Sequence, residues 1–193
     1  LGVYRQRTSR PINLNFFVHR QVQPDSKREA AWRARLDSYY TEFGIDRTKP
    51  LPQIGRAPFD ETTCAIVEEF KPEVVSFHFG LPEAPLLARV RATGAKVIAS
   101  ATTAREARWL ESRGCDAIIA QGYEAGGHRG IFLTDDTNDI SNQPGSMALV
   151  PQIVDVVKVP VIAAGGITDA RGIVAAFALG ASAVQIGTAY LFT

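Results

Sequence analysis

The sequence predicts an α/β fold in which helices surround a closed barrel of parallel strands. Apolar, β-branched runs alternate with helical patterns along nearly the whole chain, and four of the runs are continuously hydrophobic. Such runs are typical of parallel strands that are covered on both faces. Glycine-rich segments follow several of the late runs, and the ends of such strands converge on one face of a barrel. Together these observations indicate repeated βα units.

Six segments have the composition of strands. They are Ile12–Val18, Val74–Phe79, Lys96–Ser100, Ala117–Ala120, Val161–Ala164 and Ala183–Ile186. Six strands would also suit an open doubly wound sheet. The barrel is favoured because the glycine segments lie where barrel active sites form. It is also favoured because the chain opens and stops beside a strand, as the middle of a longer protein would.

Two apolar stripes predict helices between the first two strands. In each stripe the spacing is i, i+4, i+7 and i+11, which gathers the side chains on one helix face. The first stripe is Trp32, Leu36, Tyr39 and Phe43, and the second is Phe59, Thr63, Ile66 and Phe70. Further along, Thr103 with Glu106 has the form of a capping box, and Gly114 is placed to end that helix. Thr168 or Asp169 is expected to cap the last helix.

The composition is that of an ordinary globular protein, with 46% hydrophobic residues, 21% charged residues and a formal net charge of +1. A balance this close to neutral gives no electrostatic footprint for nucleic acid or an acidic membrane. No apolar run approaches the roughly 20 residues of a membrane span, and no signal peptide opens the chain. Cys64 and Cys115 are far apart and are expected to be reduced thiols. A cytoplasmic protein is therefore expected, and its oligomeric state stays open.

Three glycine-rich segments follow strands and carry the strongest functional signal: Gln121–Gly130, Ala163–Ile167 and Gln185–Thr188. Glycines there let backbone N–H groups approach a phosphate, and the dipole of a following helix adds favourable potential. Their positions match the phosphate site that barrels form after the last two strands. Tight βα turns are the alternative interpretation. The polar loop Arg129–Ser146 is long, and long loops in compact domains tend to be functional.

Three histidines lie at or just beyond predicted strand ends. His128 follows the Gly126–Gly127 pair, so its imidazole is expected at the barrel mouth, as a base or as a hydrogen-bond donor to an anion. His78 either lines the same pocket or is a core histidine, and for His19 a structural role is favoured. The histidines do not have metal-ligand spacing with a carboxylate or thiol, so no metal site is expected.

Polar side chains also occur in and after the apolar strands. Asn13 and Asn15 alternate within one strand and so point to the same face. A buried amide without a partner costs about 1–3 kcal/mol. Either the polar ring edge of a cofactor or a neighbouring strand is therefore expected to satisfy them. Gln121 has the same two interpretations, and Glu124 is either an acid of the site or a salt-bridged loop residue.

These segments together resemble the nitronate monooxygenase family, formerly called 2-nitropropane dioxygenases, and its bacterial class I members in particular. The matching pieces are PINLNFFVH, VVSFHFG, KVIASATTAREARWLESRGCDAIIAQGYEAGGHRG and VPVIAAGGITDARGIVAAFALGASAVQIGTAYLFT. The resemblance implies a single FMN-binding (β/α)8 TIM-barrel domain over residues 1–193. The six predicted strands would be strands three to eight, without the N-terminal units and the C-terminal helical part of the family.

The resemblance also implies the site and the reaction. His128 would be the active-site histidine beside the flavin, and His78 would line the substrate pocket. The residues implied to contact FMN are Asn15, Gln121, Gly126, Gly127, Gly165, Gly166, Gly187 and Thr188. Of these, the two late pairs Gly165–Gly166 and Gly187–Thr188 would hold the phosphate. The implied activity is a detoxifying oxidation of alkyl nitronates, such as propionate 3-nitronate, by O2 to a carbonyl compound and nitrite or nitrate.

Other activities stay open on the same barrel. An FMN-dependent enoyl-acyl-carrier-protein reductase shares the EAGGH segment and the AAGGI turn, and an NADH:quinone reductase is a related reading. The HRG tripeptide and the INLNFFVH strand favour the nitronate enzymes. From other classes come a non-catalytic barrel fragment that binds FMN or a phosphate, and a flavin-free phosphate-binding isomerase, because a fold does not fix its chemistry.

Overall fold

The computed structural model describes residues 1–193 apart from 22–24, 50–56, 135, 137–139 and 193. The chain divides into two compact units. The larger unit consists of Leu1–His19 and Phe59–Thr193, and the smaller unit consists of Arg20–Pro58. All the strands described below belong to the larger unit, so each unit is considered by itself.

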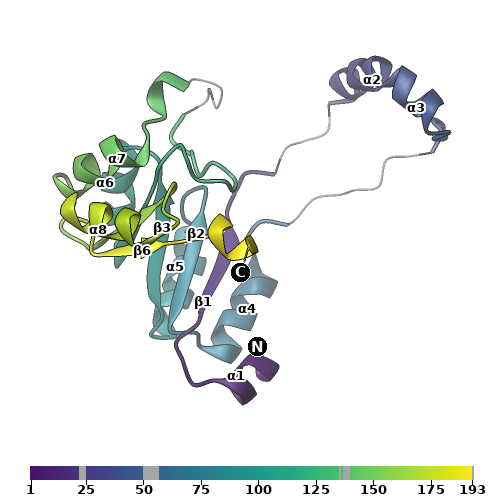
Figure 1. Ribbon diagram of the computed structural model, residues 1–193. Helices are drawn as coiled ribbons and strands as arrows, with labels where there is room; N and C mark the ends of the chain where they lie inside the picture. Colours follow the sequence, from purple (N-terminus) through teal and green to yellow (C-terminus); the bar gives the residue numbers. More distant parts are fainter. Residues whose placement is uncertain (22–24, 50–56, 135, 137–139, 193) are drawn as a thin grey trace. The chain divides into compact units, whose positions relative to one another are not determined.

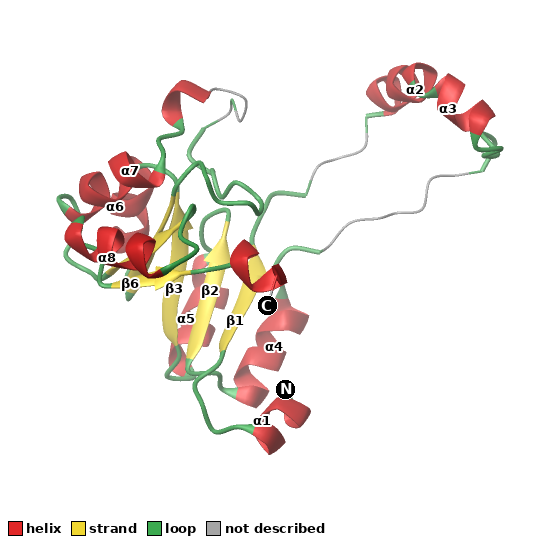
Figure 2. Cartoon of the chain, viewed as in Figure 1, coloured by secondary structure: helices red, strands yellow, loops and turns green. Residues whose placement is uncertain are grey.

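The larger unit is built on a six-stranded parallel sheet whose strands follow one another in sequence order (Figures 1 and 2). The strands are β1 (Asn13–Phe17), β2 (Val74–His78), β3 (Lys96–Ala101), β4 (Ala117–Gln121), β5 (Val161–Ala164) and β6 (Ala183–Gln185). Each predicted strand is confirmed, with its ends shifted by at most one residue. The sequential order and the flanking helices make this sheet a half-barrel, as the partial-barrel prediction requires.

The strands carry two different sets of side chains on their two faces, because successive residues of a strand alternate. The outer set packs into the hydrophobic core beneath the helices, and its buried members include Val75, Phe77, Val97, Ala99, Ile118, Ala120, Val161 and Ala163. The opposite set contains polar residues at paired positions, including Asn15, Ser76, Ser100, Gln121 and Gln185. The second face of the sheet is therefore the polar face, and it is suited to bind a ligand rather than to pack against helices.

Helices cover the outer face of the sheet between successive strands (Figure 2). They are α4 (Glu61–Phe70), α5 (Ala84–Ala92), α6 (Ala104–Ser112), α7 (Ser146–Val154) and α8 (Ala170–Ala178). Three short elements complete the unit: α1 (Gly2–Arg7), η1 (Ile140–Asn142) and η2 (Thr188–Phe192). The helix α1 was not predicted. Among the described residues, none of the helices combines the length and the apolarity that a membrane crossing requires.

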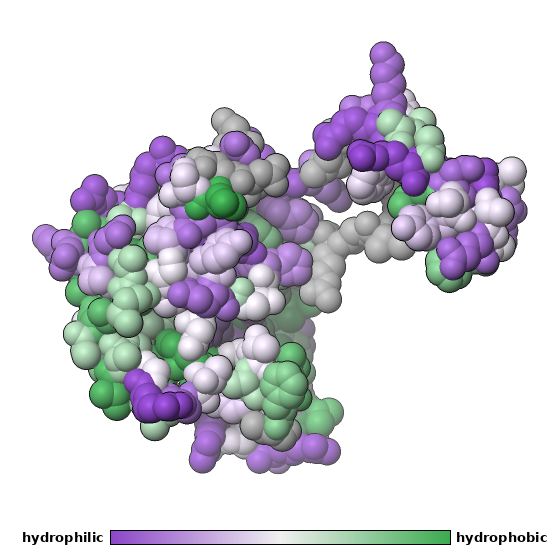
Figure 3. Space-filling view, turned by 45° about the horizontal axis from the view of Figure 1, so that its top comes forward, coloured by the Kyte–Doolittle hydropathy of each residue, from purple (hydrophilic) through white to green (hydrophobic). Residues whose placement is uncertain are grey.

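The smaller unit corrects the first helix prediction. Instead of one helix through residues 32–43 it has α2 (Ser26–Arg35) and α3 (Asp37–Glu42), which meet at Leu36. The acidic Asp37 suits the first turn of a new helix. Trp32 and Phe43 of the predicted stripe are 60% and 69% exposed. The visible face of this unit is mainly hydrophilic with a few apolar residues (Figure 3).

The buried face of α4 also differs from the prediction. Cys64 and Val67 are the buried residues of this helix, whereas Ile66 and Phe70 are 40% and 38% exposed. Phe59 is buried, as the stripe required, but it lies before the helix begins. The predicted spacing thus found the helix but placed its apolar face about one residue out of phase.

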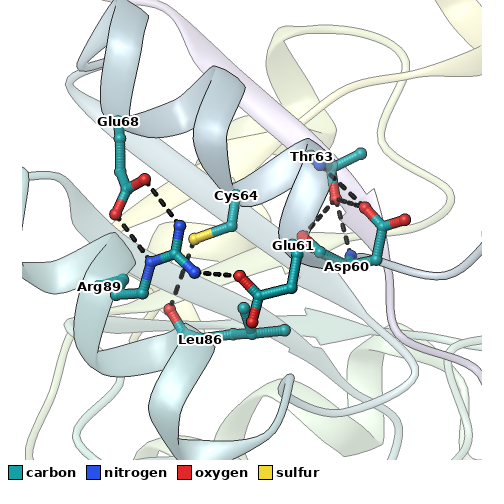
Figure 4. Close-up of polar contacts among 7 residues, drawn as sticks. All are labelled: Asp60, Glu61, Thr63, Cys64, Glu68, Leu86 and Arg89. Carbon is teal, nitrogen blue, oxygen red and sulfur yellow. Dashed lines mark hydrogen bonds and ion pairs between the residues drawn. The ribbon is translucent and has the colours of Figure 1, made fainter.

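The outer helices α4 and α5 are joined by a charged cluster around Arg89 (Figure 4). Its guanidinium donates from Nε and Nη2 to the two carboxylate oxygens of Glu68, both at 2.8 Å, and it also pairs with Glu61. A bidentate pair of this kind adds geometric definition as well as attraction. The buried Cys64 lies beneath it, with its Sγ 4.0 Å from the carbonyl oxygen of Leu86. This cluster fixes how the two helices cross on the face away from the polar strand side chains.

One of the predicted helix caps is confirmed and another is only half confirmed. Asp169 caps α8 by accepting from the backbone N–H groups of Arg171 and Gly172. Thr103 caps α6 by accepting from the N–H of Glu106. The carboxylate of Glu106 does not return to Thr103, as a capping box requires, but binds elsewhere, as described below.

Replacing Glu73 with Gln is expected to lower the thermal unfolding midpoint at neutral pH. A hydrogen bond from Arg5, with one from the N–H of Ile12, lowers the pKa of the Glu73 carboxyl from 4.5 to about 2. A carboxyl with a lowered folded-state pKa stabilises the fold above its ordinary pKa, and this is lost as pH falls through the folded value. The difference in midpoint from the wild type should shrink between about pH 4.5 and about pH 2. A circular-dichroism series with a constant difference would contradict this.

Candidate active site

A cavity of about 550 Å³ lies at the carboxyl ends of the strands, on the polar face of the sheet. Every site residue predicted from the sequence lines it: Asn15, His78, Gln121, Gly126, Gly127, His128, Gly165, Gly166, Gly187 and Thr188. Further lining residues include Phe17, Ser100, Ile119 and Glu124. The sheet therefore brings together segments that are more than a hundred residues apart in the sequence.

The three glycine-rich segments meet at one side of this cavity. A Cβ atom added to Gly165 would lie 2.9 Å from the backbone nitrogen of Ala125 and 3.0 Å from Ser146 Oγ, so only glycine fits. Gly165 also has φ +111°, which L side chains rarely adopt. A Cβ atom on Gly126 would lie 2.7 Å from Thr188 Oγ1, so the segment after β4 also approaches the segment after β6 closely. This confirms that the segments converge.

Glu124 connects two of the loops around the glycine turn. Its Oε2 accepts from the N–H and the hydroxyl of Ser146, at 2.8 and 3.0 Å, and Ser146 Oγ lies 2.8 Å from the carbonyl oxygen of Gly165. Partial burial alone would raise the pKa of the Glu124 carboxyl, but the hydrogen bonds from its own N–H and from Ser146 outweigh it, and the pKa is lowered. Glu124 is therefore a charged residue that links the loop after β4 to the start of α7.

Gln121 holds the loop that follows β4. Its side-chain oxygen accepts from the N–H of Gly130 at 2.7 Å, and its backbone carbonyl accepts from Arg129 at 2.5 Å. The side chain is 7% exposed and also donates to the loop from Nε2. One hydrogen of that amide nitrogen is left for a ligand in the cavity.

His78 is a buried histidine on the cavity floor, 8% exposed at the end of β2. Burial lowers the pKa of its imidazole below the ordinary 6.5, although a hydrogen bond to the carbonyl of His128 opposes this. The ring is therefore neutral at pH 7. Both ring nitrogens have hydrogen-bond partners, so the orientation of the His78 ring on the cavity floor is fixed.

His128 has an exposed side chain at the rim of the cavity and is flanked by aromatic rings. Its ring centroid lies 5.1 Å from that of Phe17 and 6.2 Å from that of Phe79. Phe79 has φ +71°, a strained backbone conformation for a phenylalanine. Its ring also stands edge-on to His19, at 6.2 Å. The rings of Phe17 and Phe79 form an aromatic wall beside His128, and His19 contacts this wall without lining the cavity.

The two strand asparagines are satisfied mainly by a neighbouring strand. Ser76 Oγ accepts from Asn13 Nδ2 at 3.0 Å and donates to Asn15 Oδ1 at 2.9 Å. The structural interpretation therefore holds for Asn13 and for the carbonyl of Asn15. The Nδ2 group of Asn15, which lines the cavity, has no hydrogen bond to the described part of the chain and can donate to a ligand.

The cavity suits a ligand that carries a phosphate and a polar ring. Its volume lies within the range of about 300–1,000 Å³ that is usual for ligand pockets. The turn Gly165–Gly166 supplies backbone that a Cβ would obstruct. Because Asp169 already binds the first free N–H groups of α8, this turn rather than the helix end would provide donors for a phosphate.

The sequence did not reveal three residues that line or support the site: Ser100, Ser146 and Glu106. Ser100 Oγ lies 3.1 Å from His78 Nδ1, and Ser146 supports Glu124. Glu106 is 1% exposed and holds the loop beyond the site through the backbone N–H groups of Phe132 and Leu133. A glutamate in an apolar helix face was the available signal for Glu106, whereas isolated serines gave none.

The two cysteines are buried free thiols. Burial raises the pKa of Cys115 to about 12 and also raises that of Cys64, so both free thiols stay protonated. Within the described ranges, clusters of three or more histidine, cysteine or acidic side chains that could hold a metal are absent.

Comparison with known proteins finds relatives along nearly the whole chain. A nitronate monooxygenase from Paraburkholderia phytofirmans is 43% identical and one from Pseudomonas aeruginosa is 44% identical, each over 97% of this chain. They are matched over 50% and 53% of their own lengths, so the chain spans about half of the curated relatives it matches.

Two solved structures share the arrangement of the fold. The nitroalkane oxidase from Streptomyces ansochromogenes is 37% identical with a TM-score of 0.83, over 98% of this chain and 53% of that protein. FabK from Thermotoga maritima is 30% identical with a TM-score of 0.64, over 98% of this chain and 45% of that protein. The profile of the family described as nitronate monooxygenase matches residues 3–193. The chain therefore belongs to the nitronate monooxygenase family.

Proposed function

We propose that the protein binds FMN in this cavity and uses it with O2 to oxidise alkyl nitronates. The observation that carries the proposal is the convergence of three glycine-rich segments on one cavity with a histidine at its rim. Family membership supports the same conclusion, because its relatives are named nitronate monooxygenases. Small anions of the propionate 3-nitronate type are the substrates that we infer.

Each part of the cavity would have its own task toward these ligands. Gly165–Gly166 and Gly187–Thr188 would hold the phosphate, and Asn15 Nδ2 with Gln121 Nε2 would donate to the ring edge. FMN, when bound, would supply the electron acceptor. His128 would bind the negatively charged nitronate, or take the α-proton when the neutral nitroalkane is used.

Overall, two nitronate anions and one O2 would give two carbonyl compounds and two nitrite ions. In each nitronate the carbon–nitrogen double bond is cleaved, the carbon gains one of the two oxygen atoms of O2, and the nitrogen leaves as nitrite. The chain's own contribution would be to hold the anion at His128, whose ring stands beside that of Phe17 in the cavity lining.

An anaerobic visible spectrum tests the proposal directly. The purified protein should have the absorption bands of a flavin, and these should decrease when propionate 3-nitronate is added without O2. Bands that ignore the nitronate but decrease with NADH would favour a nicotinamide-dependent reductase, the second candidate, whose family shares the EAGGH segment and the AAGGI turn. A colourless protein would contradict both.

A further inference from the structure

The backbone carbonyl of His128 receives two hydrogen bonds from the floor of the cavity. His78 donates from Nε2 and Gln121 donates from its side-chain Nε2, each at 2.8 Å. These donors stand on β2 and β4, two strands that flank β3, and both side chains are at least nine-tenths buried. The main chain at His128, the residue proposed to bind the nitronate, is therefore tied to two strands of the sheet.

The ring of His78 can make this contact in only one neutral form. A carbonyl oxygen accepts but does not donate, so the proton of the ring must be on Nε2. Nδ1 is then an acceptor, and Ser100 Oγ, 3.1 Å away, donates to it. Because Ser100 is itself buried on β3, the hydroxyl fixes both the tautomer and the orientation of the ring.

Gln121 extends the same restraint by two residues. While its nitrogen donates to the carbonyl of His128, its oxygen accepts from the N–H of Gly130. A Cβ atom on Gly130 would lie 2.7 Å from Cε1 of His78, so the loop runs directly against the histidine ring. The main chain is thus held on both sides of Arg129.

With the main chain held in this way, the direction of the His128 side chain is restricted as well. Its ring stands edge-on to Phe17 and to Phe79, at interplanar angles of 65° and 86°. Phe17 is in β1, which pairs with β2 beside His78. The main chain of His128 is therefore restrained by hydrogen bonds, and its imidazole is restrained by contacts with two aromatic rings.

We propose that His78 and Gln121 are positioning residues, two donors that fix the carbonyl of His128 and thereby aim its imidazole at the substrate. Neither ring nitrogen of His78 is free to bind substrate, so His78 acts through His128. The effect on catalysis rests on the proposed function, whereas the restraint on the loop does not.

The test compares His78→Gln with His78→Phe in the flavin-loaded protein. Glutamine can place an amide N–H where Nε2 stands, and phenylalanine fills the ring volume without a donor. We expect His78→Phe to accelerate amide hydrogen exchange in residues 128–133. It should also lower kcat for a nitronate about tenfold, the effect of one lost hydrogen bond, with a smaller change in KM. His78→Gln should stay near the wild type in both.

Two outcomes overturn the proposal: equal exchange in the two variants, or faster exchange in His78→Gln than in His78→Phe. If His78→Phe does not fold, Ser100→Ala decides instead, because it removes the hydroxyl that orients the ring but little volume. Faster exchange in residues 128–133 supports the proposal, and unchanged exchange refutes it. A wild type that ignores nitronates, while exchange changes as expected, overturns the proposed function and leaves the positioning role standing.

Discussion

The variant His128→Asn should keep its flavin and turn over nitronates at least about a hundredfold more slowly. A positioned general acid or base usually contributes at least this much to the rate. The side chain is at the cavity rim and exposed, so its removal does not open the core. The contacts that hold the loop at this residue use its backbone carbonyl, which the substitution leaves in place. Flavin absorbance per protein and nitronate-dependent O2 uptake measure the two effects separately.

The variant His19→Asn is the matched control for this experiment. It makes the same chemical change in a histidine that contacts the aromatic wall but does not line the cavity. It should keep both flavin and turnover. Unimpaired turnover in His128→Asn would remove its assigned role. Loss of flavin together with turnover would instead place His128 among the groups that hold the cofactor.

The strands could be predicted from the sequence because their signal is local. A continuous apolar run between turn residues identifies a strand of a parallel sheet without reference to its neighbours. For β5 the predicted and observed bounds are the same, Val161–Ala164. Helix faces depended on more than spacing. On α4 the actual buried pair, Cys64 and Val67, lies beside the predicted stripe, since packing against α5 decides which side turns inward.

The glycine segments and His128 could be predicted because parallel topology dictates where strand ends meet. Once the strands were placed, the segments had to converge, whatever their separation in the chain. The partners of the polar side chains could not be predicted in this way. Whether Asn13 bonds a cofactor or Ser76 depends on the register between β1 and β2, which no single strand reveals.

Replacing Glu106 with Gln is expected to destabilise the protein by about 3 kcal/mol, which corresponds to about two lost hydrogen bonds to a charged group. Its Oε2 accepts from the N–H and the hydroxyl of Thr102, both at 2.7 Å. Its Oε1 accepts from the N–H groups of Phe132 and Leu133, at 2.8 and 3.2 Å. A glutamine would turn an NH2 group toward one pair of donors. Urea unfolding at neutral pH measures the difference.

Glu69→Gln is the control for this change, because Glu69 is an exposed residue of α4 and its neutralisation should cost less than about 0.5 kcal/mol. Amide exchange at Phe132 and Leu133 adds a local measure, and it should rise in Glu106→Gln alone. A midpoint that moves no more than in Glu69→Gln would show that the four contacts do not hold the loop. With the expected shift, Glu106 anchors from the core the same loop that His78 and Gln121 restrain from the cavity.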